Sequence, residues 1–336
     1  MKRAFLIAVV LVMALTIVTG TFAATTPLLV SGGGLKTTST VKANSKYLIA
    51  CIVKNSTNPY MIKQLDGFKA AGAFMGFDAV ALAPAKADNI EEQVKIIEDL
   101  IQKGVKGLVI HPSDSNGIVP IVEKAMSLGI PVVVIGTPAN TDKIFFRTGM
   151  DYTDSGRQIT EAAIQKMGGK GNVIILEGPP QAINAKERLN GMLETIAKYP
   201  GVKVLDSQTA NFNRLNALQV MENLLQKHKD VQGVFAANDE MALGAIQALE
   251  AAGRKNVVVS GVDGSKDASQ AVLEGRLTVT SNADPYSSSW CAAAYIVKYL
   301  NDGTMPPSKF IPYPAEVAII DKSNVQNYIN NDAWWK

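Results

Sequence analysis

Apolar runs of strand length alternate with amphipathic stretches of helix length along most of this 336-residue chain. Such alternation is typical of βα units, which build parallel sheets. The stretch from Val231 to Leu249 shows one unit: an apolar run ends at the polar pair Asn238 and Asp239, and apolar residues then recur at helical spacing. The alternation therefore predicts an α/β fold.

The units form two successive series of similar size, and the chain is long enough for two cores. We therefore expect two similar lobes with parallel sheets. Strands of the first series are predicted at Tyr47–Val53, Ala79–Leu82, Gly107–His111, Pro131–Ile135 and Phe145–Thr148. Strands of the second series are predicted at Asn172–Leu176, Val202–Ser207, Val234–Ala237, Asn256–Val262 and Leu277–Ser281.

After the second series the chain has room to cross back between the lobes. A helix is predicted over Tyr286–Asn301, followed by a proline-rich segment and a strand over Val317–Ile320. Trp334 and Trp335 are expected to pack against the surface of a lobe, because large aromatic side chains dominate packing energetics.

The first 23 residues have the three parts of a secretory signal peptide. Lys2 and Arg3 precede an apolar run from Ala4 to Val18, and small residues at Thr21 and Ala23 mark a cleavage site after Ala23. A permanent membrane anchor is the alternative, although the run is shorter than the roughly 20 residues of a spanning helix. Residues 24–45 are rich in Gly, Ser and Thr and are predicted to form a flexible leader. We therefore expect an exported protein, located in the periplasm or outside the cell.

The charge and the few cysteine and histidine residues argue against several kinds of function. Without Lys2 and Arg3, 31 of the 33 basic residues remain against 30 acidic ones, and a nearly neutral exported protein is a poor candidate for binding nucleic acid. With two histidines and no Cys-x-x-Cys, a transition-metal site is not expected. Cys51 and Cys291 lie in apolar segments and could form a disulfide or remain buried thiols.

Motifs of common enzyme classes are also missing from the sequence. There is no nucleophile motif with a histidine partner and no P-loop. The glycines of Gly168–Gly171 precede a predicted strand, whereas those of a dinucleotide fingerprint follow one. We therefore expect no catalytic activity and no cofactor.

Polar side chains are expected where three of the predicted strands end, and open α/β sheets bind ligands at this edge. Asn58, Asn238 and Asp263 each follow a strand. Each asparagine could cap the helix that follows it or bind a hydroxylated ligand, and Asp263 could belong to a simple turn with Gly264. The residues alone leave these alternatives open.

Several motifs agree in order and spacing with those of a known family. F-A-A-N-D-E-M-A-L-G at Phe235–Gly244 and G-V-D-G at Gly261–Gly264 resemble the type I periplasmic sugar-binding proteins, most closely the ribose-binding members. Further matches are N-P-Y at Asn58–Tyr60, A-K-E-R at Ala185–Arg188 and A-N-F-N-R at Ala210–Arg214. The resemblance covers about residues 46–322. It implies two Rossmann-like lobes joined by a three-strand hinge, with a sugar bound in the cleft.

The resemblance also implies where the lobes divide. The three crossings would fall near Asp151, near Ala283 and near Pro312–Pro314. We therefore expect an N-terminal lobe of residues 46–150 and 284–312, and a C-terminal lobe of residues 151–283 and 313–336.

Six ligand positions of the family carry over to this chain. Amide and charged side chains would exchange hydrogen bonds with sugar hydroxyls, and the aromatic rings would face C–H groups. The implied residues are Asn58 and Tyr60 in the first lobe and Arg188, Phe212, Asn238 and Asp263 in the second.

The first lobe departs from the family pattern at three places, one of which is Met61, where the ribose binders have a second aromatic residue. Gly136 and Thr137 stand where ribose and galactose binders carry a charged anchor, and His111 stands where the ribose binders have asparagine. The departures argue against ribose itself as the ligand. We expect ligand choice to depend on His111, Gly136 and Thr137.

The resemblance implies a monomeric receptor that delivers a sugar or polyol to the permease of an ABC transporter. The alternative with the same fold is a sensing subunit that presents its ligand to a chemoreceptor or a histidine kinase. The sequence does not separate these two roles.

Overall fold

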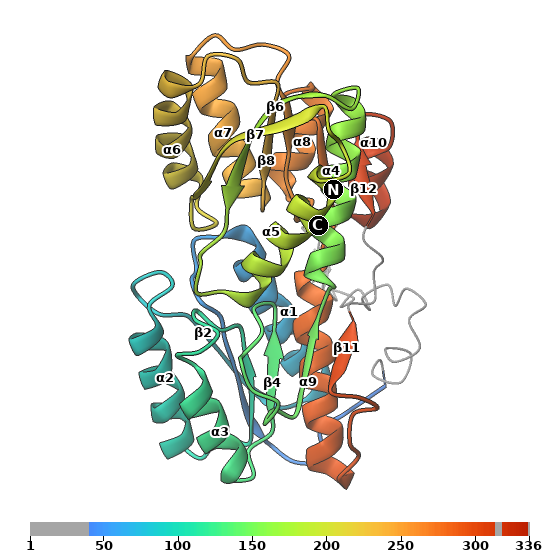
Figure 1. The fold of residues 1–336 in the computed structure, drawn as a ribbon. Helices are drawn as coiled ribbons and strands as arrows, with labels where there is room; N and C mark the ends of the chain where they lie inside the picture. The colour runs from blue at the N-terminus through green and yellow to red at the C-terminus, as the bar shows by residue number, and fades with distance from the viewer. Residues whose placement is uncertain (1–39, 313–317, 335–336) are drawn as a thin grey trace, which may run out of the picture.

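The computed structural model describes residues 40–312 and 318–334 and consists of two α/β lobes stacked on one another (Figure 1). Each lobe contains one six-stranded sheet with helices on both faces. The prediction of two α/β lobes with mostly parallel sheets is confirmed. The predicted signal peptide and most of the predicted leader lie outside the described residues.

The sheet of the first lobe has the strand order β11-β5-β4-β3-β1-β2, and all neighbouring strands are parallel. Residues of its central strands are buried on both faces, as the continuous apolar runs of a covered parallel sheet require. The strands are β1 (Leu48–Ile52), β2 (Asp78–Leu82), β3 (Gly107–Ile110), β4 (Val132–Ile135), β5 (Phe146–Gly149) and β11 (Phe310–Pro312).

The sheet of the second lobe has the order β12-β10-β9-β8-β6-β7. Its strands are parallel except for β12, which runs antiparallel to β10 at the edge. The strands are β6 (Gly171–Glu177), β7 (Val202–Thr209), β8 (Gly233–Ala236), β9 (Val258–Ser260), β10 (Val279–Ser281) and β12 (Ile319–Asp321).

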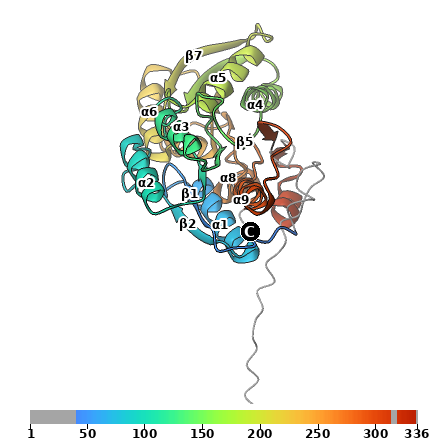
Figure 2. The same cartoon turned by 90° about the horizontal axis from the view of Figure 1, so that it is seen from below.

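Helices cover the first sheet on both faces. Helix α1 (Pro59–Met75) lies beside α9 (Pro285–Asp302) on one face, and the two helices are seen side by side in Figure 2. Helices α2 (Ile90–Gln102) and α3 (Val119–Ser127) cover the other face. Each face therefore has its own cluster of buried apolar side chains.

The second sheet is covered in the same way. Helices α4 (Tyr152–Lys166) and α5 (Ile183–Ile196) pack together on one face, and α6 (Arg214–Lys227) and α7 (Asp239–Ala251) pack together on the other, next to α8 (Lys266–Glu274). The short helix α10 (Val325–Asn327) and a π-helical turn at Tyr328–Asp332 complete this lobe.

The chain passes between the two sheets three times. The first passage lies between β5 and α4, around Asp151, and the second lies between β10 and α9, around Ala283. The third passage lies between β11 and β12, where residues 313–317 lie outside the described residues. The strand expected at Val317–Ile320 is observed as β12, which begins at Ile319.

The end of the expected leader lies against the first lobe. Ala43 donates its backbone N–H to the Met75 carbonyl over 2.8 Å, and Asn301 donates its side-chain amide to the Lys42 carbonyl over 2.7 Å. Val41 and Ala43 also pack against the apolar cluster around α1 and α9. Residues 41–45 are therefore part of the folded lobe, contrary to the prediction of a flexible leader up to residue 45.

The two cysteines are free thiols buried in the first lobe. Cys51 lies in β1 and Cys291 lies in α9. Burial raises the pKa of both thiols, that of Cys291 to about 12. The structure thus favours two buried thiols, and not a disulfide, of the two alternatives that the sequence left open. In residues 40–312 and 318–334, no helix is both long and apolar enough to cross a membrane.

Candidate functional site

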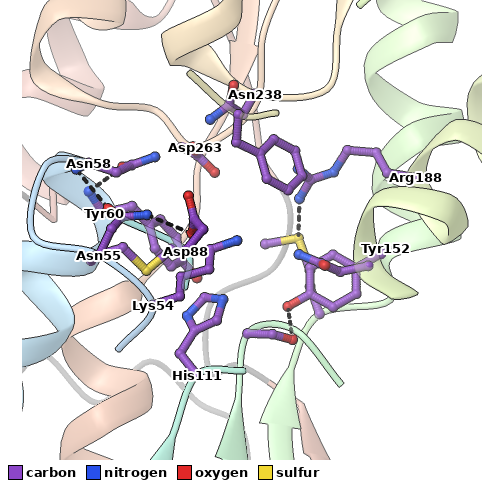
Figure 3. Close-up of a pocket in the computed structure, with 15 residues that line it drawn as sticks. Lys54, Asn55, Asn58, Tyr60, Asp88, His111, Tyr152, Arg188, Asn238 and Asp263 are labelled. Carbon is purple, nitrogen blue, oxygen red and sulfur yellow. Dashed lines mark hydrogen bonds between the residues drawn. The ribbon is translucent and has the colours of Figure 1, made fainter. Parts of the chain in front are cut away.

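A cavity of about 510 Å³ lies between the lobes and is lined by side chains of both (Figure 3). Seven of the eight predicted ligand residues line it: Asn58, Tyr60, His111, Arg188, Phe212, Asn238 and Asp263. The eighth, Thr137, is buried behind His111.

Asn58 and Asn238 each cap a helix and also line the cavity. Asn58 Oδ1 accepts the N–H of Tyr60 over 2.9 Å at the start of α1, and Asn238 Oδ1 accepts the N–H of Met241 over 3.0 Å at the start of α7. The cap fixes the orientation of each side chain and leaves its NH₂ group as a donor. Each asparagine can therefore cap its helix and bind a ligand at the same time.

Asp263 projects into the cavity from the turn after β9. The indole N–H of Trp334 donates to the Asp263 carbonyl over 2.6 Å and holds this turn in place. Burial, with the nearby Asp239 as a second cause, raises the pKa of the Asp263 carboxyl well above its ordinary value. Among the described residues the carboxyl has no hydrogen-bond partner, so it is available to hydroxyl donors.

Asp239 supports the turn that carries Asp263. It is fully buried, and its two oxygens accept the Thr280 hydroxyl over 2.6 Å and the Ser265 N–H over 2.7 Å. Burial raises the pKa of Asp239 to about 6, although both hydrogen bonds oppose the rise. The acidic residue beside Asn238 is thus a positioning group within the lobe.

Replacing Asp239 by asparagine is expected to flatten the pH dependence of stability. Because the folded-state pKa exceeds the unfolded value of 3.8, folding takes up a proton between about pH 4 and 6, and stability falls as pH rises through this window. Asparagine can keep both hydrogen bonds without a buried charge. On going from pH 4 to 7, the free energy of unfolding of the variant should rise relative to that of wild type by on the order of 1 to 3 kcal/mol.

Thermal unfolding at pH 4.5, 6 and 7.5 measures this effect. Asp78→Asn, which changes an exposed carboxylate, is the control and should follow the wild-type pH dependence. An Asp239→Asn melting temperature that runs parallel to that of wild type across the three pH values would show that Asp239 does not titrate in this window.

Arg188 is 4% exposed and reaches the cavity from α5. One terminal nitrogen donates to the Ala237 carbonyl, the other lies 3.8 Å from the Met150 sulfur, and the guanidinium stands 5.4 Å from the centre of the Tyr152 ring. Its Nε, like the Oδ1 of Asn184 one helical turn earlier, is buried without a partner among the described residues. A bound ligand could satisfy both atoms.

Phe212 lines the cavity from the loop between β7 and α6. Asn211 and Phe212 both have left-handed backbone, with φ of 56° and 55°, which is uncommon for residues other than glycine. A Cβ at Gly178 would lie 2.4 Å from the Phe212 ring, so glycine is required there for the ring to occupy its place. Strained backbone of this kind is often found at ligand sites.

Tyr60 and Trp334 meet across the boundary between the lobes. Their ring centres are 6.3 Å apart in an edge-on arrangement, and Tyr60 also stands 6.4 Å from the ring of His111. Trp334 belongs to the buried cluster of the second lobe, as expected for packing against a lobe. It therefore joins the C-terminal segment to both lobes next to the cavity. Trp335 lies outside the described residues.

His111 fills the space that a side chain at position 136 would need. Its Nδ1 lies 2.8 Å from Gln64 Oε1, and its Nε2 lies 3.1 Å from Thr137 Oγ1. Gly136 has φ +62°, and a Cβ there would lie 2.1 Å from His111 Cε1. Burial and the charge of Lys54 hold the pKa of His111 well below its ordinary value. The ring of His111 and the glycine at position 136 are therefore sterically coupled.

The sequence interpretation missed a polar group in the turn after β1. Asn55 Oδ1 accepts the Asn58 N–H over 3.1 Å, and Asn55 Nδ2 donates to Asp88 Oδ1 over 3.0 Å. Lys54, Asn55 and Asp88 all line the cavity. The position of Lys54 and Asn55 at the end of a strand was a usable signal. There was no such signal for Asp88, because this residue lies in the loop between β2 and α2 and does not directly follow a strand.

A serine of the first lobe caps a helix of the second lobe. Ser115 Oγ accepts the N–H of Ile183 over 2.9 Å, and the Ser115 N–H donates to the Gln181 carbonyl over 3.1 Å. The residue at the N-cap position of α5, Ala182, provides no side-chain cap of its own. Helix α5, which carries Arg188, is therefore capped only when the two lobes are in contact.

Comparisons with known proteins agree with this geometry. A sequence profile described as a periplasmic binding protein domain matches residues 49–304. The chain is 35% identical over 252 residues to the ribose import binding protein of Escherichia coli K12, covering 75% of this chain and 84% of that protein. A solved ABC transporter periplasmic solute-binding protein of Actinobacillus succinogenes with bound D-allose has a TM-score of 0.78 and 31% identity, covering 84% of this chain and 100% of that chain. The fructose-binding periplasmic domain of a hybrid two-component system has a TM-score of 0.77 and 25% identity. The match covers 84% of this chain and 93% of that chain.

Proposed function

The chain belongs to the periplasmic binding protein domain family, as its motifs predicted, and we propose that it is an exported receptor that captures a sugar or polyol and delivers it to an ABC-type permease. It would act as a monomer in the periplasm or outside the cell. The import role of the ribose binding protein and the sugar bound to the Actinobacillus protein support this proposal. The relatives named are solute-binding proteins, which agrees with the expectation that the chain is not an enzyme.

The cavity between the lobes is the observation on which the proposal rests. The second lobe contributes Arg188, Asn184 and Asp263 to the lining, and Arg188 Nε and Asn184 Oδ1 are buried without hydrogen-bond partners among the described residues. An unpaired buried polar group costs about 1 to 3 kcal/mol, so these groups require a partner that both donates and accepts. Sugar hydroxyls do both, and the rings of Tyr60 and Phe212 can cover the C–H faces of a sugar.

Closure of the lobes would couple binding to delivery. A ligand that contacts both lobes favours the closed state by its differential affinity, and the permease would recognise that state. The cap that Ser115 gives to α5 also exists only in the closed arrangement. Binding and closure would therefore stabilise each other.

A panel of uncharged pentoses, hexoses and polyols tests the proposal by thermal shift. The panel includes D-ribose, D-allose, D-fructose and xylitol, each at millimolar concentration. At least one member should raise the melting temperature by several degrees, because a ligand that binds only the folded state stabilises it by mass action. A melting temperature that stays unchanged with every member would contradict the proposal.

Replacing Ser115 by alanine is expected to weaken the binding of the best panel member about fivefold, because an N-cap is worth about 1 kcal/mol and this one exists only in the closed state. Titration calorimetry measures the affinity. Ser113→Ala is the matched control, since Ser113 lies in the same loop, is equally buried and has no partner for its hydroxyl among the described residues. Equal affinities of the two variants would argue against a contribution to binding from the cap that Ser115 gives to α5.

A sensing role is the second candidate. The fructose-binding domain of a hybrid two-component system has the same fold, so capture of the ligand can also serve signalling. The genes next to this one distinguish the two roles. Permease and ATPase genes would favour import, and a gene for a receptor kinase would favour sensing.

A further inference from the structure

Lys54 is a buried cation in the wall of the cavity. It lies in the turn after β1, is 3% exposed, and extends from the first lobe toward the middle of the site (Figure 3). Its ammonium stands 5.0 Å from the centre of the Phe212 ring, on the opposite lobe. In the part of the chain that the structure describes, the ammonium forms no hydrogen bond and no ion pair.

An ammonium group at such a site needs oxygen acceptors, because removing a charge from water without partners is strongly unfavourable. Burial lowers the pKa of Lys54, and the carboxyls of Asp88 and Asp263 oppose this effect from a distance. Neither carboxyl lies within ion-pair distance of the ammonium. Its three N–H donors therefore have no acceptor among the described residues and are available to a ligand in the cavity.

The other polar groups of the first lobe have less to offer a ligand. Both ring nitrogens of His111 are engaged with Gln64 and Thr137, and Asn58 uses its oxygen for the helix cap. Gly136 has no side chain. Lys54 is thus the one cation that the described part of the first lobe contributes to the cavity lining.

The formal charges of the side chains that line the cavity balance. Lys54 and Arg188 are cationic, and Asp88 and Asp263 are carboxylic acids with formal negative charge. A charged group of a ligand would meet side chains of both signs in this lining, and at least two of them would carry its own sign. Because like charges repel strongly in a poorly hydrated site, the balanced lining favours an uncharged ligand.

We propose that Lys54 is a ligand-binding, specificity-determining residue that donates hydrogen bonds to an oxygen atom of an uncharged sugar or polyol. It supplies a charged contact from the turn after β1, whereas the turn after β4 has room only for Gly136 beside His111. This inference rests on the proposed function of the same cavity.

Titration calorimetry with Lys54→Met tests the inference. Methionine keeps a long apolar side chain and removes the charge. Lys86→Met is the control, because it removes an equal charge from an exposed position of the same lobe that does not line the cavity. The probes are the uncharged panel, the monodeoxy analogues of its best member, D-ribonate, D-gluconate and D-glucosamine.

Wild type and Lys86→Met should bind at least one uncharged probe and none of the three charged ones. Lys54→Met should bind the best probe at least about tenfold more weakly, as expected for a charge-assisted hydrogen bond. One deoxy analogue should bind wild type as weakly as Lys54→Met binds the parent sugar, and Lys54→Met should not discriminate between that analogue and the parent. The melting temperature of ligand-free Lys54→Met should be equal to or above that of wild type.

Three results would overturn the inference. Wild-type affinity in Lys54→Met would show that Lys54 does not contact the ligand. An equal loss for the parent and for every deoxy analogue, together with a lower melting temperature without ligand, would show a structural role only. Tighter binding of D-ribonate, D-gluconate or D-glucosamine than of every neutral probe would reject an uncharged ligand. Failure of wild type to bind any probe at all would instead refute the proposed function, and with it this inference.

Discussion

Replacing Arg188 by alanine is expected to abolish measurable sugar binding. Its guanidinium lines the cavity, is held by the Ala237 carbonyl and stands against the Tyr152 ring, and its Nε has no partner among the described residues. Each hydrogen bond from a charged group is worth about 1.5 to 3 kcal/mol, and two such bonds correspond to a loss of at least about a hundredfold in affinity. Titration calorimetry with the best panel member measures the loss.

The matched control is Arg157→Ala, which removes an exposed arginine from the neighbouring helix α4 and breaks only a surface ion pair with Glu194. Surface ion pairs contribute about 0 to 1 kcal/mol, so this variant should bind like wild type. Far-ultraviolet circular dichroism should show that both variants are folded. Affinity within threefold of wild type in folded Arg188→Ala would refute the role of Arg188.

Replacing Gly136 by aspartate is expected to destabilise the first lobe strongly. The left-handed backbone at position 136 costs about 1 to 3 kcal/mol for a residue with a side chain. The clash with His111 adds about 1 to 3 kcal/mol, as overpacking does elsewhere. The melting temperature should fall by on the order of 10 °C.

Two further variants separate these effects. Gly129→Asp has a similar backbone, with φ +77°, but nothing lies within 4 Å of its Cβ, so it should show the backbone cost alone. Adding His111→Ala to Gly136→Asp should recover part of the lost stability, because it removes the ring that clashes. Equal melting temperatures for the Gly129 and Gly136 variants would contradict the coupling of His111 and Gly136.

The family and the two-lobe fold could be predicted because many local patterns agree. The alternation of strand and helix patterns gave the α/β fold, and motifs such as that around Asn238 gave the family. The carboxyl ends of parallel strands meet at one edge of a sheet, so turn residues such as Asn58 and Asp263 were expected near a ligand from their positions alone. The structure places both in the wall of one cavity.

The parts of the site that were not predicted depend on contacts between distant segments. A lysine is almost always exposed, so Lys54 had no reason to be placed in the wall of a cavity before the fold was known. The cap that Ser115 gives to α5 joins two lobes and has no local pattern. The coupling of Gly136 to His111 is likewise visible only when the ends of β3 and β4 are seen side by side.

A crystal structure of the protein saturated with its best panel member tests the central claim most directly. The sugar should lie in the cavity between the lobes, with oxygen atoms within hydrogen-bond distance of Arg188 and Asp263 on one side and of Lys54 on the other. A sugar bound outside this cavity, or in contact with one lobe only, would contradict the account.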